Sequence, residues 1–383
     1  MYLIILQWIL VVKLQGSLPI PPLSIAQYSV KNNKLIGEIS TQFWNLSSII
    51  KLDLSHNNLS GMLPQCLSNS SEFLIILSLE NNNFCGTLPA TYMEGRNLKV
   101  MDVSYNQLEG QVPRSLSNCK MLEILLLSNN RFSDIFPTWF GKLPKLRVLS
   151  LWSNGFHGAI GKSESNIEFP KLQIIDVSYN NFTGKLPSEH IQSWNFMKVA
   201  HLTYGKGNIY NVTFMIASIK TTLRYFIWNS YYAFSIEMTY KGIKGTYETI
   251  SKIVVIIDLS SDRFEGQISE VIGNLKGLIL LNLSNNILTG QIPSSLGNLK
   301  ELESLELSQN KLSGEIPQQL LQLTFLEFFN VSNNRLKGPI PQGQQFSTVQ
   351  NDSYLGNTGL CGTPLTKKCK ISKRSTQPPP ISK

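Results

Sequence analysis

The sequence of 383 residues predicts an α/β repeat solenoid interrupted by one long insertion. The first observation is the phrase L-x-L-x-x-N-x-L-x-G-x-I-P, which returns about every 24 residues and is plainest from Leu281 to Pro293. The second observation is a break in this period near the middle of the chain, and the third is a pair of cysteines near its end. A fixed period of this length is typical of a chain that coils once per repeat.

Each position of the phrase has a physical role. The L-x-L pair alternates with period two, which predicts a short strand with its leucines inward, and neighbouring strands stack into a parallel sheet. The asparagine amide satisfies backbone groups of its own and adjacent coils, glycine permits the following bend, and proline ends it. The segments after each proline, such as residues 294–299, predict short helical turns. The whole is a leucine-rich-repeat horseshoe or superhelix, with strands on the concave face and helical turns on the convex face.

The repeats fall into two blocks, seven before the break and four after it. Asp262 replaces the register asparagine just after the break, and we expect that position to be weaker because a carboxylate lacks the amide donor. Asp134 stands where glycine is usual in repeat five. We divide the chain into a degenerate first repeat or signal-like segment (1–24), repeats one to seven (25–187), a non-repeat insertion called the island (188–251), repeats eight to eleven (252–341), a C-terminal cap (342–369) and a basic, disordered tail (370–383).

The first twelve residues form a nearly continuous apolar run that has two interpretations. Its length fits the apolar part of a signal peptide, but no basic segment precedes it and no small-x-small cleavage site follows near Gly16. The alternative, which we favour, is a damaged repeat left by loss of upstream sequence, with its strand near residues 7–9. Twelve apolar residues are too few to span a bilayer.

The chain has five cysteines, which limits the disulfides that it can form. We expect a disulfide between Cys361 and Cys369 to close the cap, with two free thiols as the alternative. An odd count leaves at least one free thiol among Cys66, Cys85 and Cys119.

Composition and motifs argue for binding and against catalysis. Only 15% of residues are charged, and the net charge of +9 includes a basic cluster in the tail that attracts anionic polymers or is simply solvated. The four histidines have no metal-ligand spacing, no phosphate-binding loop follows a strand, and nothing indicates nucleic-acid recognition. We therefore expect no enzyme activity, no metal and no cofactor.

Glycosylation sequons fit a protein of the secretory route, although a repeat rich in Leu-Ser-Asn also creates them incidentally. Asn282 and Asn330 occupy outward strand positions, where a glycan would block the concave face. The eight candidates are Asn45, Asn58, Asn69, Asn181, Asn211, Asn282, Asn330 and Asn351.

The G-x-I-P repeat, the island and the Gly-Leu-Cys-Gly cap resemble plant leucine-rich-repeat receptor-like proteins, and most of all immune receptors of the fungal-resistance (Cladosporium-resistance) type. The resemblance covers about residues 14–369. It implies a cell-surface location on the extracellular side and a peptide or protein ligand. Signalling would pass through leucine-rich-repeat receptor kinases as adaptor and co-receptor. It also implies a membrane helix C-terminal to the cap, absent from this chain, so that we expect a membrane-proximal portion of such a receptor.

Candidate binding residues come from the concave face and the island. Tyr105, Trp152 and Tyr179 occupy nearly equivalent positions in repeats four, six and seven and predict an aromatic stripe. In the island, Tyr232 and the pair Lys241-Gly242 match a Y-x8-K-G pattern of similar receptors, where the island is thought to contact ligand or co-receptor. Phe328 faces outward from the last block. The alternative for the stripe and for the island residues is packing of the island onto the sheet. By analogy with the family, the block that carries Phe328 contacts the partner kinase.

Three functions remain open at this point. A receptor ectodomain is favoured by the island and the cap. A secreted inhibitor of a microbial cell-wall-degrading enzyme has about as many repeats but normally no island. A non-functional receptor fragment is suggested by both ends of the chain.

Overall fold

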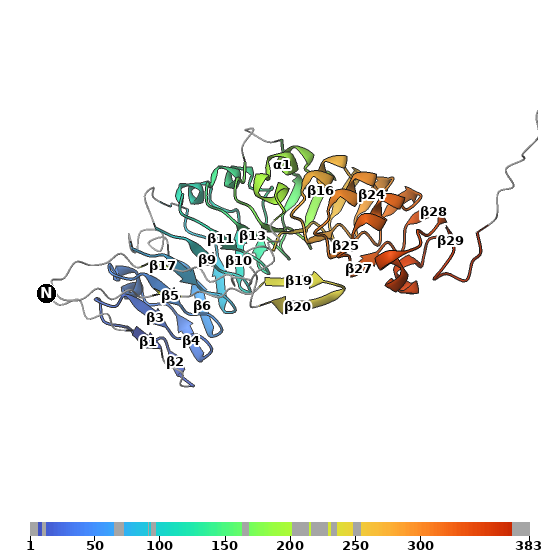
Figure 1. The fold of residues 1–383 in the computed structure, drawn as a ribbon. Helices are drawn as coiled ribbons and strands as arrows, with labels where there is room; N and C mark the ends of the chain where they lie inside the picture. Colours follow the sequence, from blue (N-terminus) through green and yellow to red (C-terminus); the bar gives the residue numbers. More distant parts are fainter. Residues whose placement is uncertain are drawn as a thin grey trace, which may run out of the picture.

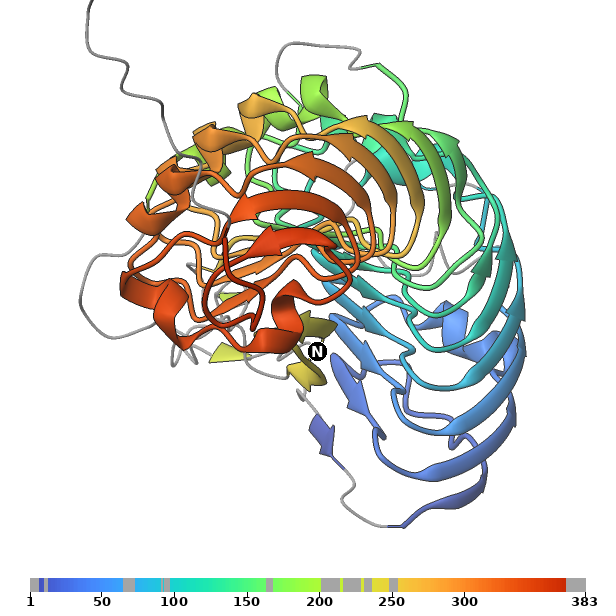
Figure 2. The same cartoon turned by 90° about the vertical axis from the view of Figure 1, so that its right-hand side faces the viewer.

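The computed structural model describes residues 7–9, 13–64, 73–90, 92, 97–162, 168–200, 214–215, 229–230, 236–247 and 254–369. They form one curved solenoid, seen from the side in Figure 1 and along its coils in Figure 2. Successive coils are displaced along the axis, so that the curve rises as a superhelix. The predicted leucine-rich-repeat solenoid is confirmed.

A parallel sheet of twelve short strands lines the concave face. In β23, Leu281 enters the core, whereas Leu280 and Asn282 on either side face the concave surface, as the period of two requires. The first strand, β1, pairs in parallel with β3. The strands are β1 (Gln7–Ile9), β3 (Gln27–Ser29), β5 (Lys51–Asp53), β7 (Ile76–Ser78), β9 (Val100–Asp102), β11 (Ile124–Leu126), β13 (Val148–Ser150), β15 (Ile174–Asp176), β21 (Ile256–Asp258), β23 (Leu280–Asn282), β25 (Ser304–Glu306) and β27 (Phe328–Asn330).

The insertion leaves this sheet unbroken. β15 pairs directly with β21, with Ile174 opposite Ile256, so that repeats seven and eight are neighbours although 82 residues separate their register positions. Below the sheet, the Phe182 ring stacks between Phe156 and Phe264 with centroid distances of 6.1 Å on each side. The core is therefore continuous across the point where the island leaves the solenoid.

A second row of strands follows the ladder asparagines, which the sequence analysis did not predict. It comprises two parallel sheets that separate at repeat five, where Asp134 replaces glycine and a single bridge joins Ile135 to His157. The strands are β2 (Gln15–Ser17), β4 (Lys34–Glu38), β6 (Asn58–Met62), β8 (Asn83–Gly86), β10 (Gln107–Gly110) and β12 (Arg131–Phe132), then β14 (His157–Ala159), β16 (Asn181–Lys185), β22 (Arg263–Gln267), β24 (Ile287–Gly290), β26 (Lys311–Gly314), β28 (Arg335–Pro339) and β29 (Gly359–Cys361).

Most convex segments are single 3-10 turns, in agreement with the predicted helical turns. The turns are η1 (Thr41–Asn45), η3 (Arg114–Asn118), η4 (Thr138–Lys142), η6 (Glu270–Asn274), η7 (Ser294–Asn298) and η8 (Gln318–Gln322), with η9 (Gln344–Thr348) and η10 (Asn351–Tyr354) in the cap. Four of those in the repeats (η3, η4, η7 and η8) begin after the repeat proline, whose fixed φ suits the start of a helical turn, whereas η1 and η6 begin after Ser40 and Ser269.

The convex segment of repeat seven is longer than the others. It contains the helix α1 (Ser188–Ser193) and the turn η5 (Asn195–Lys198), within the range that we assigned to the island. The Trp194 side chain is buried in the main core, and His190 Nδ1 lies 2.7 Å from a carboxylate oxygen of buried Glu168. These contacts hold the segment to the repeats, so that the described non-repeat chain begins after η5.

An asparagine ladder joins the coils. The Oδ1 atom of Asn286 accepts the Phe264 N–H at 2.9 Å, while its Nδ2 donates to carbonyl oxygens of Leu259 and Leu283 at 2.8 and 3.2 Å. At Asp262 the Phe182 N–H bond remains at 2.8 Å, but Oδ2 is buried without a hydrogen-bond partner. Burial, opposed by the Phe182 and Asn180 backbone N–H groups, raises the pKa of Asp262 to about 8.

The cap continues the ladder by one further coil. Asn357 repeats the pattern, since its Oδ1 accepts the Leu336 N–H at 2.9 Å, a role that the sequence analysis did not assign to it. Phe346 packs on Phe329 at 4.9 Å between ring centroids and covers the last repeat. Cys361 and Cys369 form a disulfide with a Cα–Cα distance of 5.0 Å.

Candidate functional site: the concave face and its docked hairpin

The three aromatic residues of the expected stripe lie next to one another. Trp152 stands between Tyr105 and Tyr179, at ring-centroid distances of 6.0 and 6.2 Å. Tyr105 and Tyr179 have left-handed backbone conformations, with φ of 54° and 57°. This conformation is required before every ladder asparagine, and it costs a bulky residue roughly 1–2 kcal/mol, whereas Asn adopts it more readily. Two tyrosines at such positions are unfavourable for folding and suggest a surface role.

The described part of the island is mainly a hairpin of β19 (Ile236–Tyr240) and β20 (Ile243–Tyr247). It also contains a separate short pair of strands, β17 (Phe214–Met215) and β18 (Asn229–Ser230). In the hairpin, β19 and β20 are joined by a tight turn. This two-residue turn is Lys241-Gly242, with φ of 52° and 76°. Positive φ at both central residues is typical of a type I′ turn, whose twist matches that of a hairpin.

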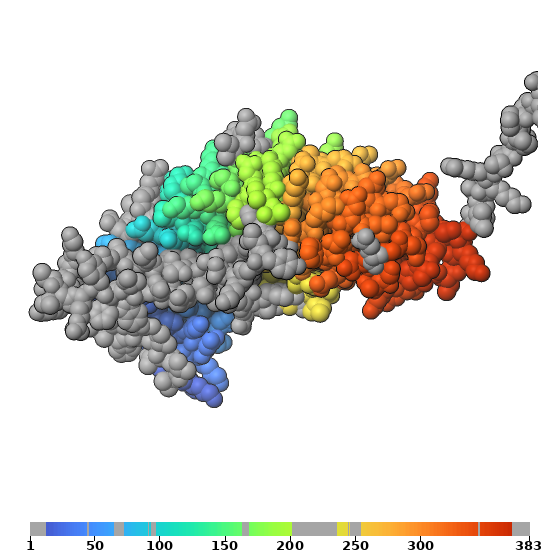
Figure 3. Space-filling view, in the orientation of Figure 1, coloured from blue at the N-terminus to red at the C-terminus, as the bar shows by residue number. Residues whose placement is uncertain are grey.

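The hairpin lies on the concave face of the solenoid. Ile236 and Met238 of β19 are buried in a second apolar cluster, together with the first residues of concave strands such as Val148, Ile174 and Ile256. In the space-filling view, the hairpin lies against the repeats of the last block (Figure 3). The apolar row explains why the hairpin docks here.

The hairpin tip is held by charged and aromatic contacts to the last repeats. Lys241 Nζ lies 2.8 Å from a Glu303 carboxylate oxygen and 2.7 Å from one of Glu327. The Tyr240 hydroxyl donates to Glu303. Partial burial opposes the charge, but these carboxylates hold the pKa of Lys241 above its ordinary value. A Cβ on Gly242 would clash with the Phe328 ring, so the turn requires glycine for space as well as for φ.

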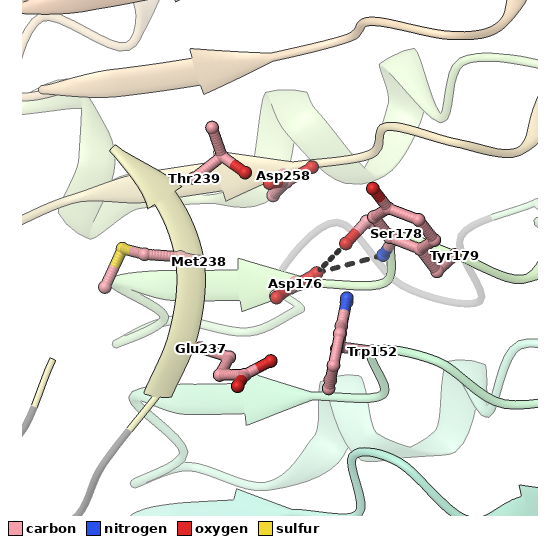
Figure 4. A pocket seen from close by; sticks show the side chains of 8 residues that line it. All are labelled: Trp152, Asp176, Ser178, Tyr179, Glu237, Met238, Thr239 and Asp258. Carbon is pink, nitrogen blue, oxygen red and sulfur yellow. Dashed lines mark hydrogen bonds between the residues drawn. The ribbon is translucent and has the colours of Figure 1, made fainter. Parts of the chain in front are cut away.

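Three expected binding residues, Lys241, Gly242 and Phe328, therefore meet at one place, in contact with their own chain. Tyr232 lies outside the described residues. The stripe reaches the same hairpin, since Trp152 and Tyr179 line a small pocket with residues of β19 (Figure 4).

Carboxyl groups form the floor of this pocket. Asp176 and Asp258 occupy matching positions in the paired strands β15 and β21, and Glu237 of β19 faces them. Burial and the neighbouring Asp258 raise the pKa of Asp176 well above its ordinary value, and burial also raises the pKa of Asp258.

An aspartate recurs at this strand position in several repeats, which is consistent with a structural role. Most copies fit that role, because Asp102 and Asp176 each accept hydrogen bonds from the serine two residues later. The signal that could have singled out Asp176 and Asp258 is their shared position on either side of the island, where a contiguous sheet makes them neighbours.

The sequons differ in exposure. Asn58, Asn181 and Asn351 are exposed, whereas Asn282 is 3% exposed and its Nδ2 donates to Asp258 Oδ2 at 2.9 Å. Asn330 is half-buried and donates to Glu306. The side chains of the three other sequons lie outside the described part of the structure.

We expect glycans at Asn58, Asn181 and Asn351 and an unmodified Asn282 when the chain is expressed through the secretory route. A glycan on Asn282 has no room in the folded concave face. Glycopeptide mass spectrometry measures the occupancy of each site. Asn181, which is exposed at the start of β16, is the internal control. Full occupancy of Asn282 in folded protein would contradict the placement of its side chain.

Within the described residues, no group of three or more His, Cys, Asp or Glu side chains is arranged to hold a metal ion. No helix in that part of the chain is long and apolar enough to cross a bilayer.

Comparisons with known proteins agree with this architecture. The family described as Leucine rich repeat matches residues 73–132 and 120–182, and a second description of the repeat matches 48–70, 277–299 and 301–323. Receptor like protein 27 of Arabidopsis thaliana is 44% identical over 269 residues, which cover 69% of this chain and 31% of that protein. The chain thus spans about a third of the length of this relative.

Solved receptor ectodomains have the same fold. The ectodomain of the receptor kinase GASSHO1/SCHENGEN3 from Arabidopsis thaliana, in complex with CASPARIAN STRIP INTEGRITY FACTOR 2, has a TM-score of 0.65 at 27% identity and covers 94% of this chain and 41% of its own. The Arabidopsis receptor kinase HAESA, in complex with the peptide hormone IDA and the co-receptor SERK1, has a TM-score of 0.53 at 27% identity, with coverage of 91% and 56%.

The fold, the ladder and the repeat matches define a leucine-rich-repeat protein. Within that class, the chain belongs to the plant receptor-like proteins.

Proposed function

We propose that this chain is the extracellular ligand-recognition region of a plant cell-surface receptor-like protein of the immune type. The concave face, from the aromatic stripe to the docked hairpin, binds a peptide or protein ligand. Signalling passes through partner receptor kinases, which bind at the last four repeats and the hairpin tip. Of the receptor ectodomains of similar fold, that of HAESA is in complex with a peptide hormone and a co-receptor, which supports a ligand and a partner of these kinds.

The observation that carries the proposal is the continuity between the stripe and the hairpin. Trp152 and Tyr179 stand beside β19, so that ligand bound on the stripe also touches the element whose tip reaches Glu303 and Glu327. Rigid Tyr and Trp side chains are typical anchors of protein interfaces. This arrangement gives a ligand access to the surface offered to a kinase.

Trp152→Ala tests the ligand surface. We expect it to weaken capture of an active microbial protein or peptide fraction by about thirtyfold, as for the loss of an interface anchor. Phe73→Ala, which removes an exposed aromatic outside the stripe and outside the last four repeats, is the control and should leave capture unchanged. Binding is measured by biolayer interferometry on the secreted glycoprotein, with kinase ectodomains added.

Equal losses in both variants would contradict a specific stripe. Inhibition of a polygalacturonase, with no kinase ectodomain bound under any condition, would favour the inhibitor class over the receptor class.

A further inference from the structure

The pocket between the hairpin and the concave sheet is lined by residues of four separate segments. Asp176, Ser178 and Tyr179 come from β15 and the turn after it, Asp258 from β21, and Glu237 from β19, with Trp152, Met238 and Thr239 completing the wall (Figure 4). It is about large enough for one group the size of a water molecule and is partly open. It exists only because the island folds back onto the sheet.

The two aspartates on the sheet side of the pocket differ in their hydrogen bonds. Asp258 accepts the Ser260 N–H on Oδ1 and the Asn282 amide on Oδ2, at 3.0 and 2.9 Å. Glu237 lines the same pocket from β19, and, in addition to burial, its charge helps to raise the pKa of Tyr105.

Asp176 accepts the Ser178 N–H and hydroxyl on Oδ1, at 3.0 and 2.6 Å, whereas its Oδ2 has no partner. The Asp176 side chain is 1% exposed, and its free oxygen points toward β19 in Figure 4. A buried acceptor without a partner is costly, so a donor from outside would be bound favourably there.

The walls favour a cation. No Lys, Arg or His is among the lining residues, although the whole chain has a net charge of +9. The rings of Trp152 and Tyr179 border the same space, and aromatic faces attract cations. A guanidinium is too broad for the space, whereas an ammonium group matches the size of water and carries three donors.

We propose that this pocket binds a primary ammonium group of the ligand, a lysine side chain or a peptide N-terminus, with Asp176 Oδ2 as its direct acceptor. The proposal rests on the proposed function in that the ligand lies on the concave face. It adds the chemical class of the ligand group and its place.

The binding has a pH dependence of known sign. Asp176, Asp258 and Glu237 are the acidic groups that face the pocket, with Tyr105 beside Glu237, Tyr179 on the wall and Asp262 nearby. In the empty pocket, burial and mutual repulsion favour the protonated form of the Asp176–Asp258 pair. A bound ammonium favours the ionised form, so binding releases a proton and tightens as pH rises.

The test uses the intact secreted chain and small amines as probes. Nα-acetyl-lysine methylamide represents a side chain, glycine methylamide represents an N-terminus, and the Nε-acetylated lysine derivative is the uncharged control. Ligand-observed NMR titration measures saturable binding. We expect millimolar affinity for at least one amine, none for the control, and a loss of about tenfold or more in Asp176→Asn.

Asp102→Asn is the matched variant, because Asp102 has the same strand position and the same bonds to its following serine but lies outside the pocket. It should bind the amines as the unmodified chain does. The absence of saturable amine binding up to tens of millimolar, or equal binding by Asp176→Asn, would overturn the proposal and leave the pocket to water. Trp152→Ala reports separately on ligand capture, so a failure of the receptor function does not alter the amine result.

Discussion

Replacing Lys241 by glutamate is expected to release the hairpin from the last repeats while the solenoid stays folded. Lys241 Nζ now bridges Glu303 and Glu327 at 2.8 and 2.7 Å, and the substitution places three carboxylates together. The apolar contacts of Ile236 and Met238 remain, but the tip loses its attachment. We expect proteolysis within the island to accelerate by about tenfold or more, because the docked and open states then differ less in free energy.

Limited proteolysis and amide hydrogen exchange over residues 236–247 measure this release. Lys337→Glu, on exposed β28, makes the same change of charge away from the hairpin and should alter neither rate. The double variant Lys241→Glu with Glu327→Lys restores one opposite pair and should recover part of the protection. Unchanged protection in Lys241→Glu would show that the apolar contacts alone hold the hairpin.

The double variant also distinguishes two roles of the hairpin tip in kinase binding, a direct contact through Lys241 and the docking of the hairpin. If kinase partners bind Lys241 directly, the double variant still fails to bind them, because the lysine has moved to the neighbouring repeat. If the partners need only the docked hairpin, the double variant recovers binding together with protection. The intramolecular ion pairs make this distinction possible, and the sequence pattern alone did not indicate it.

Periodicity predicted the features that repeat. Because every coil solves the same packing problem, the strand positions, the inward leucines and the asparagine ladder follow from one phrase, and Asn286 behaves as that phrase requires. The second row of strands follows from the same phrase but was missed. Its residues carry no strong strand pattern, and they pair only because stacked coils bring matching segments into register.

Features that occur once in the chain were harder to predict. The aromatic spacing predicted the stripe of Tyr105, Trp152 and Tyr179. The neighbouring pair of Asp176 and Asp258 was not predicted, because it depends on the pairing of two strands that the island separates in the sequence. The sequence showed Asp134 only as a departure from the usual glycine, although the second sheet divides at that coil. In each case the missing information was which distant segment packs alongside, and a repeat phrase does not contain it.

Asp262→Asn is expected to stabilise the coil just after the island, because it restores the amide donor that every neighbouring ladder position has. The folded-state pKa of Asp262, about 8, lies above its unfolded value near 4. The stability that the protonated Asp262 side chain contributes to its coil is therefore fully present below about pH 4. It is lost as pH rises toward 8, by roughly 1.4 kcal/mol per pH unit. We expect a gain of about 4–5 kcal/mol in local opening free energy at pH 7 and only about 1 kcal/mol at pH 4.

Hydrogen exchange of the Phe182 amide, which Asp262 accepts at 2.8 Å, measures this opening directly and avoids the assumption that a repeat array unfolds in one step. The reciprocal change, Asn286→Asp, introduces the same defect one coil later. It should speed exchange of the Phe264 amide, with a loss of opening free energy of comparable size and the same direction of pH dependence. A gain from Asp262→Asn that is equal at pH 4 and pH 7 would contradict the assignment to the carboxyl proton. It would place the effect in packing, since only a titrating group makes the difference between the two chains change with pH.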